Sequence, residues 1–108
     1  MDLLGPSIEE LFAFCDYKFS IKTVLWLVSE MIERLNSMHS ANFIHRDLKT
    51  ENLCIGNGKR ESICHLIDFG LAKRYVNPKT GKHITFKNKS DRIGTLRFSS
   101  TGATNCKE

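Results

Sequence analysis

The segment His45-Arg46-Asp47-Leu48-Lys49-Thr50-Glu51-Asn52, followed downstream by Asp68-Phe69-Gly70, decides the fold and the chemistry of this chain. The first segment carries a carboxylate at Asp47 and an amide at Asn52. The second begins with another carboxylate, Asp68, which comes directly after a short apolar run that is typical of a strand. We expect a tight loop and the end of a paired strand to bring these three side chains together.

These residue types in this order suit phosphoryl transfer, which depends on positioning and charge neutralisation more than on covalent help from the protein. Asp47 is expected to accept the proton of an attacking hydroxyl, and Lys49 to contact the transferred phosphate. Asn52 and Asp68 supply oxygen atoms for Mg²⁺. A lone His-Arg-Asp is usually an ordinary turn, but both motifs at this separation are not expected by chance. The predicted cofactors are therefore ATP and Mg²⁺.

Two helices are predicted before this loop. Ser7-Ile8-Glu9-Glu10 has the pattern of a capping box, with Ser7 as N-cap and Glu10 reaching back, and it begins a short helix that ends near Cys15 or Asp16. Ser20 is a second candidate N-cap. Apolar residues then recur at helical spacing and predict a long amphipathic helix that faces the core. They are Val24, Leu25, Val28, Met31, Ile32, Leu35 and Met38.

Two short strands are predicted around the second motif. Leu53-Cys54-Ile55 and Ile63-Cys64-His65-Leu66-Ile67 are apolar runs, and Gly56-Asn57-Gly58 begins the connection between them, which favours a small hairpin. After Gly70 the sequence becomes polar and basic, and no regular element is predicted after Tyr75. The expected fold class is α+β, mainly helical, with a small β-hairpin and a long irregular segment behind it.

The chain resembles the casein kinase 1 family of serine/threonine protein kinases over nearly its whole length, and the likeness weakens after Ser99. The segments that carry the resemblance are Leu3-Leu4-Gly5-Pro6-Ser7-Ile8-Glu9-Glu10-Leu11-Phe12, Phe43-Ile44-His45-Arg46-Asp47, Ile67-Asp68-Phe69-Gly70-Leu71-Ala72-Lys73 and Gly94-Thr95-Leu96-Arg97-Phe98. The resemblance implies ATP-dependent phosphorylation of protein substrates. It also implies that residues 1–108 are a kinase C-lobe portion that runs from the hinge to the activation segment.

Further site residues follow from this resemblance on the nucleotide side. Leu3 and Leu4 match hinge positions whose backbone meets adenine, and Ile67 matches the residue before Asp-Phe-Gly that lines the nucleotide pocket. Cys54 stands where the family has a leucine beneath the adenine, which leaves a smaller floor. Glu10 occupies a position beside the ribose, although its capping role is at least as good an interpretation.

The resemblance assigns four more residues to the substrate side. Thr95 matches the threonine that packs beside the catalytic Asp and Lys. Three basic residues match an anion site that favours acidic or already phosphorylated protein substrates: Arg46, Lys73 and Arg97. The stretch from Lys73 to Arg97 is itself strongly basic, with Asp91 as its single acid, and such a stretch suits an acidic or phosphorylated partner or a solvated loop.

The chain departs from the family in several places. Thr50 stands where the family has proline, and the sequence after Phe98 differs from the family's substrate-side loop. The chain has no glycine-rich G-x-G-x-x-G loop and no V-A-I-K strand. Because these parts cradle the phosphates in kinases, we expect an incomplete catalytic domain, without the N-lobe and the later C-lobe helices, and inactive by itself.

Composition excludes several other classes. The longest apolar run, Val24-Leu25-Trp26-Leu27-Val28, is too short to span a bilayer, and the first residues do not form a signal peptide. The four cysteines contain no C-x-x-C pair, which argues against a zinc site and a disulfide framework and favours reduced thiols. We expect a cytoplasmic or nuclear protein.

Two other functions remain open at this point. One is a non-catalytic binding module derived from a kinase, against which the intact Asp47, Asn52 and Asp68 argue. The other is a nucleic-acid binder that uses the basic stretch. Nucleic acid is disfavoured because aromatic residues are sparse between the basic ones.

Overall fold

The computed structural model describes residues 3–85 and 93–104. The chain divides into two compact units. The first unit comprises Met1–Ser37 and Thr50–Asp68, and the second comprises Met38–Lys49 and Phe69–Glu108. Residues 86–92, the middle of the basic stretch, and Cys106 lie outside the described residues. Each unit is considered by itself below.

Helix α1, Ile8–Phe14, begins and ends where the sequence predicts. Glu10 N–H donates to Ser7 Oγ at 3.2 Å, and Ser7 N–H donates to Glu10 Oε2 at 2.7 Å, so the capping box is formed. Ser7 donates to the Glu10 carboxylate from its N–H and, at 2.9 Å, from its hydroxyl, and these two bonds, the backbone one first, lower the pKa of the Glu10 carboxyl. The box satisfies two backbone groups that the first turn of a helix leaves unpaired.

Helix α2, Ile21–Ser40, is the long helix that the sequence predicts, and its N-cap is Ser20, whose Oγ accepts a hydrogen bond from Thr23 N–H at 3.2 Å. The predicted face is only partly correct. Within the first unit, the core of Ile8, Leu53 and Cys64 packs against Trp26, Leu27 and Met31 of this helix.

Four residues that the sequence predicts to face the core are exposed instead, with between 41% and 64% of their surface accessible. They are Val24, Leu25, Val28 and Ile32. Both faces of α2 are apolar, so periodicity alone could not choose between them. The hairpin packs on the face of Trp26 and Leu27, which also carries Glu30. The Glu30 carboxylate accepts hydrogen bonds from Cys64 N–H at 3.0 Å and from Arg34 at 3.1 Å.

The predicted hairpin is present in the first unit. Strand β2, Leu53–Ile55, pairs antiparallel with β3, Cys64–Leu66, so that Cys54 lies opposite His65. A 3₁₀ turn, η2, Gly58–Arg60, lies in the connection. Gly56 cannot be replaced without rearrangement, because a Cβ there would overlap the Arg60 carbonyl.

The N-terminal segment extends this hairpin along its other edge. Gly5 N–H donates to Ile55 O at 2.9 Å, and Ile55 N–H donates to Pro6 O at 3.1 Å. Ser7 and Cys54 then form an isolated bridge. The residues before α1 are therefore fixed against β2, although the sequence gives them no strand pattern.

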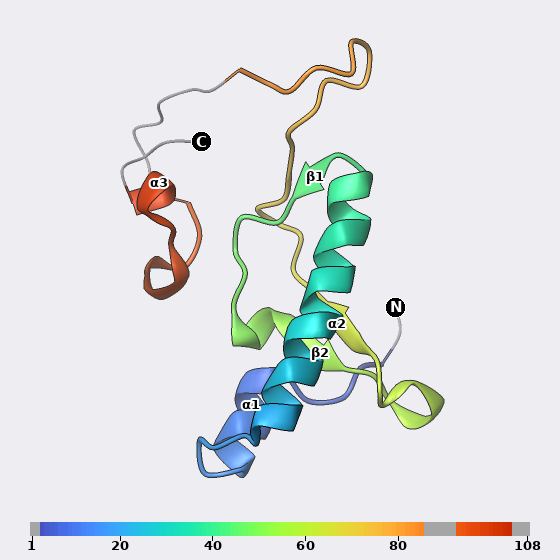
Figure 1. Ribbon diagram of the computed structural model, residues 1–108, viewed down its shortest axis with the longest axis vertical. Helices are drawn as coiled ribbons and strands as arrows, with labels where there is room; N and C mark the ends of the chain where they lie inside the picture. The colour runs from blue at the N-terminus through green and yellow to red at the C-terminus, as the bar shows by residue number, and fades with distance from the viewer. Residues whose placement is uncertain (1–2, 86–92, 105–108) are drawn as a thin grey trace. The chain divides into compact units, whose positions relative to one another are not determined.

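The second unit is organised by a pair of two-residue strands. Strand β1, Phe43–Ile44, pairs antiparallel with β4, Lys73–Arg74, and the two run side by side in Figure 1. Tyr75 follows directly and donates twice, from its N–H to Asn42 O at 3.0 Å and from its hydroxyl to His39 O at 2.9 Å. These contacts join the residues that follow β4 to the end of α2.

The prediction that nothing after Tyr75 is regular is wrong. Residues 75–84, here called the basic hairpin, fold back on themselves: Ile84 N–H donates to Tyr75 O at 2.8 Å, and Val76 bridges His83. Asn77 closes the turn because its side-chain oxygen accepts from Lys79 N–H at 2.9 Å. A 3₁₀ turn, η3, Leu96–Phe98, and a four-residue helix, α3, Thr101–Thr104, follow. Elements this short leave no periodicity to read.

None of the helices in the described part of the chain has the length and apolar content that crossing a bilayer requires. The described cysteines are free thiols, with Cys54 and Cys64 buried and Cys15 exposed. Burial, reinforced by the charge of Glu30, raises the pKa of the Cys64 thiol to about 11.

Alkylation should separate these thiols, because the thiolate is the reactive form and Cys64 is both protonated and only 1% exposed. With iodoacetamide near neutral pH, we expect rapid modification of Cys15 and none of Cys64 until the chain is denatured. Mass spectrometry of the two tryptic peptides measures this directly. Equal rates for Cys15 and Cys64 in the folded chain would contradict the packing of β3 against α2.

Candidate active site

Asp47 is the one acid among the described residues of the second unit, and several contacts hold it. Its Oδ1 accepts hydrogen bonds from the Thr95 hydroxyl at 2.7 Å and from Thr95 N–H at 2.8 Å. Its Oδ2 lies 3.2 Å from Lys49 Nζ. Asp47 N–H donates to Nδ1 of His45, a residue that is 2% exposed and whose ring contacts that of Phe69 at 5.5 Å. Asp47 is therefore held by its backbone N–H and by both of its carboxylate oxygens.

These contacts lower the pKa of Asp47. The Thr95 hydroxyl is the largest cause, Lys49 adds to it, and burial opposes it. The carboxylate is therefore ionised at neutral pH and has acceptor capacity on Oδ2, which is the state required of a group that orients a hydroxyl and takes its proton.

Gly94 brings Thr95 to this position. Its φ of 89° is left-handed, and a Cβ there would lie 2.5 Å from the Arg46 carbonyl oxygen. Only glycine allows the two backbones to approach so closely. Arg46 itself has a φ of 70°, and its Nε donates to Leu71 O at 2.6 Å. Backbone strain of this kind at Arg46 is common at functional sites.

Asn52 and Asp68 belong to the first unit, at the end of the hairpin. Ile67 N–H donates to Asn52 O at 2.9 Å, so the residue before Asp68 is paired with Asn52 by the backbone. Asn52 is 5% exposed, and Asp68 has a left-handed φ of 60°. Asn52 ends the 3₁₀ turn η1, Thr50–Asn52, which is tied to α1 because the Thr50 hydroxyl donates to Glu9 Oε2 at 2.6 Å.

The donor chemistry of Asn52 and Asp68 fits Mg²⁺. Both offer oxygen, the hard ligand that this ion prefers, and Mg²⁺ is commonly held by one or two carboxylates together with waters and substrate phosphates. The described residues contain no cluster of three or more His, Cys, Asp or Glu side chains that could hold a metal ion by themselves. Asn52 and Asp68 are therefore consistent with a magnesium site that takes its remaining ligands from substrate phosphates.

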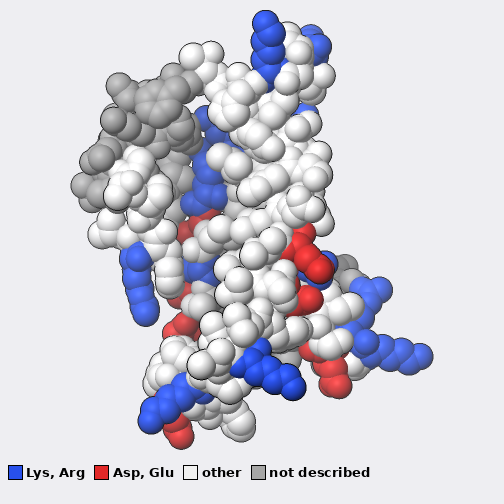
Figure 2. Space-filling model, viewed as in Figure 1, with Lys and Arg blue, Asp and Glu red and all other residues white. Residues whose placement is uncertain are grey.

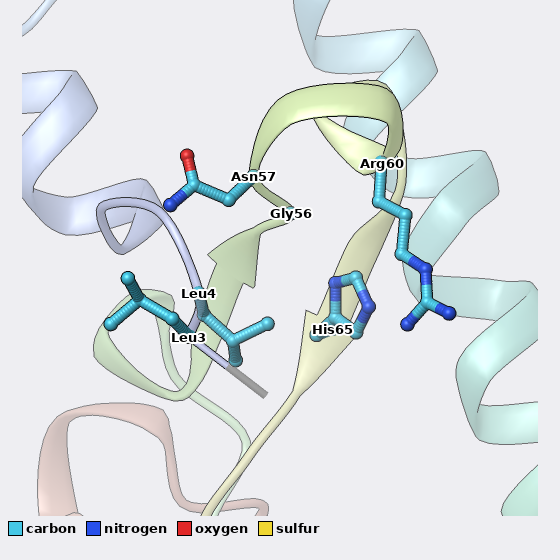
Figure 3. Close-up of a pocket in the computed structure, with 6 residues that line it drawn as sticks. All are labelled: Leu3, Leu4, Gly56, Asn57, Arg60 and His65. Atoms are coloured by element: carbon cyan, nitrogen blue, oxygen red, sulfur yellow. The ribbon is translucent and has the colours of Figure 1, made fainter. Parts of the chain in front are cut away.

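The five residues predicted on the nucleotide side all lie in the first unit, but they are not all together. Leu3 and Leu4 line a cavity of about 180 Å³ with Arg60 and His65 on its opposite side (Figure 3). The others do not line it. Cys54 is buried in β2, Ile67 is half-buried after β3, and Glu10 is engaged in its capping box. The nucleotide roles of these residues stay predictions.

The three basic residues of the predicted anion site all lie in the second unit. Arg46 is bonded to Leu71, and the Arg97 guanidinium lies 5.3 Å from the centre of the Phe98 ring. Lys73 is half-buried in β4. Their binding role stays a prediction.

The protein kinase domain model matches residues 6–104. The chain belongs to the protein kinase family. Kinases in general use ATP with a metal ion and act on proteins or small molecules, and the domain match supports protein substrates in this general sense. In this chain, the His-Arg-Asp motif contains Arg46, which has a left-handed backbone, and Asp47, which is hydrogen-bonded to Thr95. The Asp-Phe-Gly motif begins with Asp68, which also has a left-handed backbone.

Sequence reasoning missed three contacts around the candidate residues. The Thr50–Glu9 bond and the Glu30–Cys64 bond join residues that are 41 and 34 positions apart, and the ring of Phe69 packs on His45. One signal was available, because Glu30 is an acid on an apolar helix face, and such a residue usually has a buried partner.

Replacement of Thr95 by valine should raise the pKa of Asp47 toward its ordinary value, because the strongest hydrogen bond to the carboxylate is lost. Because the pKa of Asp47 is lower in the folded state, its ionised form stabilises the fold at any pH above the pKa of an ordinary aspartate. This stabilisation is lost as the pH falls through the pKa that Asp47 has in the folded state. The variant should therefore lose stability at neutral pH, by about 1 kcal/mol, and depend less on pH in the acid range. Carboxyl ¹³C titration by NMR and urea unfolding measure both effects.

The matched control is Thr101→Val, which changes the same side chain at an exposed position of α3. It should leave the titration of Asp47 unchanged. An unaltered Asp47 pKa in Thr95→Val would show that the hydrogen bond does not form in solution.

Proposed function

We propose that this chain is the catalytic-loop portion of a serine/threonine protein kinase of the casein kinase 1 type, spanning hinge to activation segment over residues 1–108. It takes part in transfer of the γ-phosphoryl group of ATP to a serine or threonine hydroxyl of a protein. The observation that supports this most strongly is the ionised Asp47 carboxylate, held by Thr95 at 2.7 and 2.8 Å and by Lys49 at 3.2 Å.

The roles follow from the chemistry of each side chain. The substrate oxygen forms a bond to the γ-phosphorus while the bond to the bridging oxygen of ADP breaks, and Asp47 takes the hydroxyl proton. Lys49 neutralises charge on the transferred group. Mg²⁺ neutralises the phosphates when bound, and Asn52 and Asp68 are the residues proposed to hold it.

The substrate class rests on two features. Lys49 at its position in the loop is similar to serine/threonine kinases and unlike tyrosine kinases. Arg46, Lys73 and Arg97 are proposed to bind an acidic or phosphorylated residue of the substrate, since guanidinium and ammonium groups bind carboxylates and phosphates by charge-assisted hydrogen bonds. Adenine is proposed to lie against Leu3, Leu4, Cys54 and Ile67. A ribose contact of Glu10 competes with its two hydrogen bonds to Ser7.

The test of the proposal is Asp47→Asn in the full polypeptide that the gene encodes. Removal of the proton acceptor should lower kcat for phosphorylation of casein by a factor of about 10² or more. Incorporation of labelled phosphate measures it. Asp16→Asn is the matched control, because Asp16 is an exposed carboxylate with a left-handed φ of 54° that asparagine tolerates. Equal activity in Asp47→Asn and the wild type would refute the assigned role.

The anion site predicts a separate effect of Arg97→Ala. KM for an acidic serine peptide should rise several-fold while kcat changes little, because a binding contact away from the reacting atoms is lost. KM for a neutral serine peptide should stay the same. Lys59→Ala, which removes an exposed cation from η2 of the first unit, serves as control. Identical KM changes for the two peptides would remove Arg97 from substrate recognition.

A further inference from the structure

The second unit contains a cleft whose floor is apolar and rigid. It has a volume of about 200 Å³, and its floor is formed by Ile44 of β1 with Tyr75 and Ile84 of the basic hairpin. Tyr75 is fixed by its hydrogen bonds to His39 O and Asn42 O, and Ile84 by its N–H bond to Tyr75 O. A preformed apolar slot of this size suits one large apolar side chain of a ligand.

The rim of the same cleft is cationic. Lys73, Arg74 and His83 line it together with the apolar floor. Arg74 is exposed, and its guanidinium lies over the Phe43 ring at 4.8 Å, which orients the group without neutralising it. A carboxylate that approaches this rim meets the positive charges of Lys73 and Arg74 in β4.

The charge of the second unit as a whole favours an acidic ligand. Its described residues include seven Lys and Arg against one acid, Asp47, which is already bonded to Thr95 and Lys49. Figure 2 shows blue side chains and no red ones at the upper end of the view, where Figure 1 places the basic hairpin. Long-range attraction of acidic segments follows from such a distribution.

We propose that this cleft docks an acidic protein segment that inserts one large apolar side chain between Ile44, Tyr75 and Ile84. Its Asp and Glu residues contact Lys73, Arg74 and His83. The cleft shares Lys73 with the proposed anion site, but Arg46 and Arg97 do not line it, and its apolar floor and Arg74 do not belong to that site. Docking requires no nucleotide and no catalysis, so this proposal stands or falls independently of the proposed function.

A protein segment fits the cleft better than a nucleic acid does. Single-stranded nucleic acids bind basic grooves through bases stacked on open aromatic faces. The Tyr75 ring is flanked by the rings of His39 and His83, with centroids 6.2 and 5.7 Å away. The Tyr75 ring is thus already in contact with two aromatic neighbours, and the cleft offers a slot for one apolar side chain.

The experiment measures fluorescence anisotropy of a labelled Asp/Glu peptide with one central leucine, without nucleotide, on the full polypeptide. Replacement of the leucine by serine should weaken binding about tenfold, the effect of losing one buried aliphatic side chain. Arg74→Gln should weaken binding of both peptides. Lys79→Gln is the matched control, because it removes the same charge from the turn of the hairpin outside the cleft, and it should have a clearly smaller effect.

A second variant guards against local unfolding in Arg74→Gln. Ile84→Val trims one methylene from the floor, so it should weaken the leucine peptide about threefold and leave the serine peptide unchanged. Three outcomes would overturn the proposal: equal affinity for the two peptides, equal effects of Arg74→Gln and Lys79→Gln, or tighter binding of a single-stranded oligonucleotide of the same charge.

Discussion

The hydrogen bonds between Asp47 and Thr95 are the constraint on which the second unit depends. They join residues 48 positions apart, and they hold the loop that contains Asp47 to the segment that contains Thr95. Closing so long a loop costs entropy, which grows slowly with its length. Two hydrogen bonds to an ionised carboxylate, together with the close approach that Gly94 permits, offset that cost. The strained backbone of Arg46 lies at the centre of this contact.

The first unit is held by a different set of contacts. Its apolar core is small, and two acids of the helices fix the chain around it. Glu9 of α1 binds Thr50 at the beginning of η1, and Glu30 of α2 binds the backbone of Cys64 in β3. Because Asn52 is the last residue of η1 and Asp68 comes shortly after β3, these two bonds support the positions of both proposed magnesium ligands. Thr50 does so where the casein kinase 1 resemblance leads one to expect proline.

The sequence could predict the parts of the fold that depend on residues close together along the chain. The capping box depends on residues three positions apart, and the β2–β3 hairpin depends on a short connection with Gly56, where a Cβ would force the Arg60 carbonyl to move. The side of α2 that is buried could not be predicted, because both faces are apolar. Strands β1 and β4 have two residues each, too few for an alternating pattern. Motifs in the sequence identified the candidate residues. The contacts that hold them join residues far apart in the chain, so only the structure could reveal them.

Asn52 and Asp68 are proposed to hold magnesium, and the most direct measurement of this is paramagnetic broadening by Mn²⁺. In the full polypeptide with a non-hydrolysable ATP analogue, trace Mn²⁺ should broaden the NMR signals of the Asn52 side-chain amide and the Asp68 backbone amide first. Signals of the exposed carboxylates on α1 and α2, such as Glu33, should broaden only at much higher concentration. Broadening that begins at Glu33, or that leaves Asn52 and Asp68 sharp, would contradict the assignment.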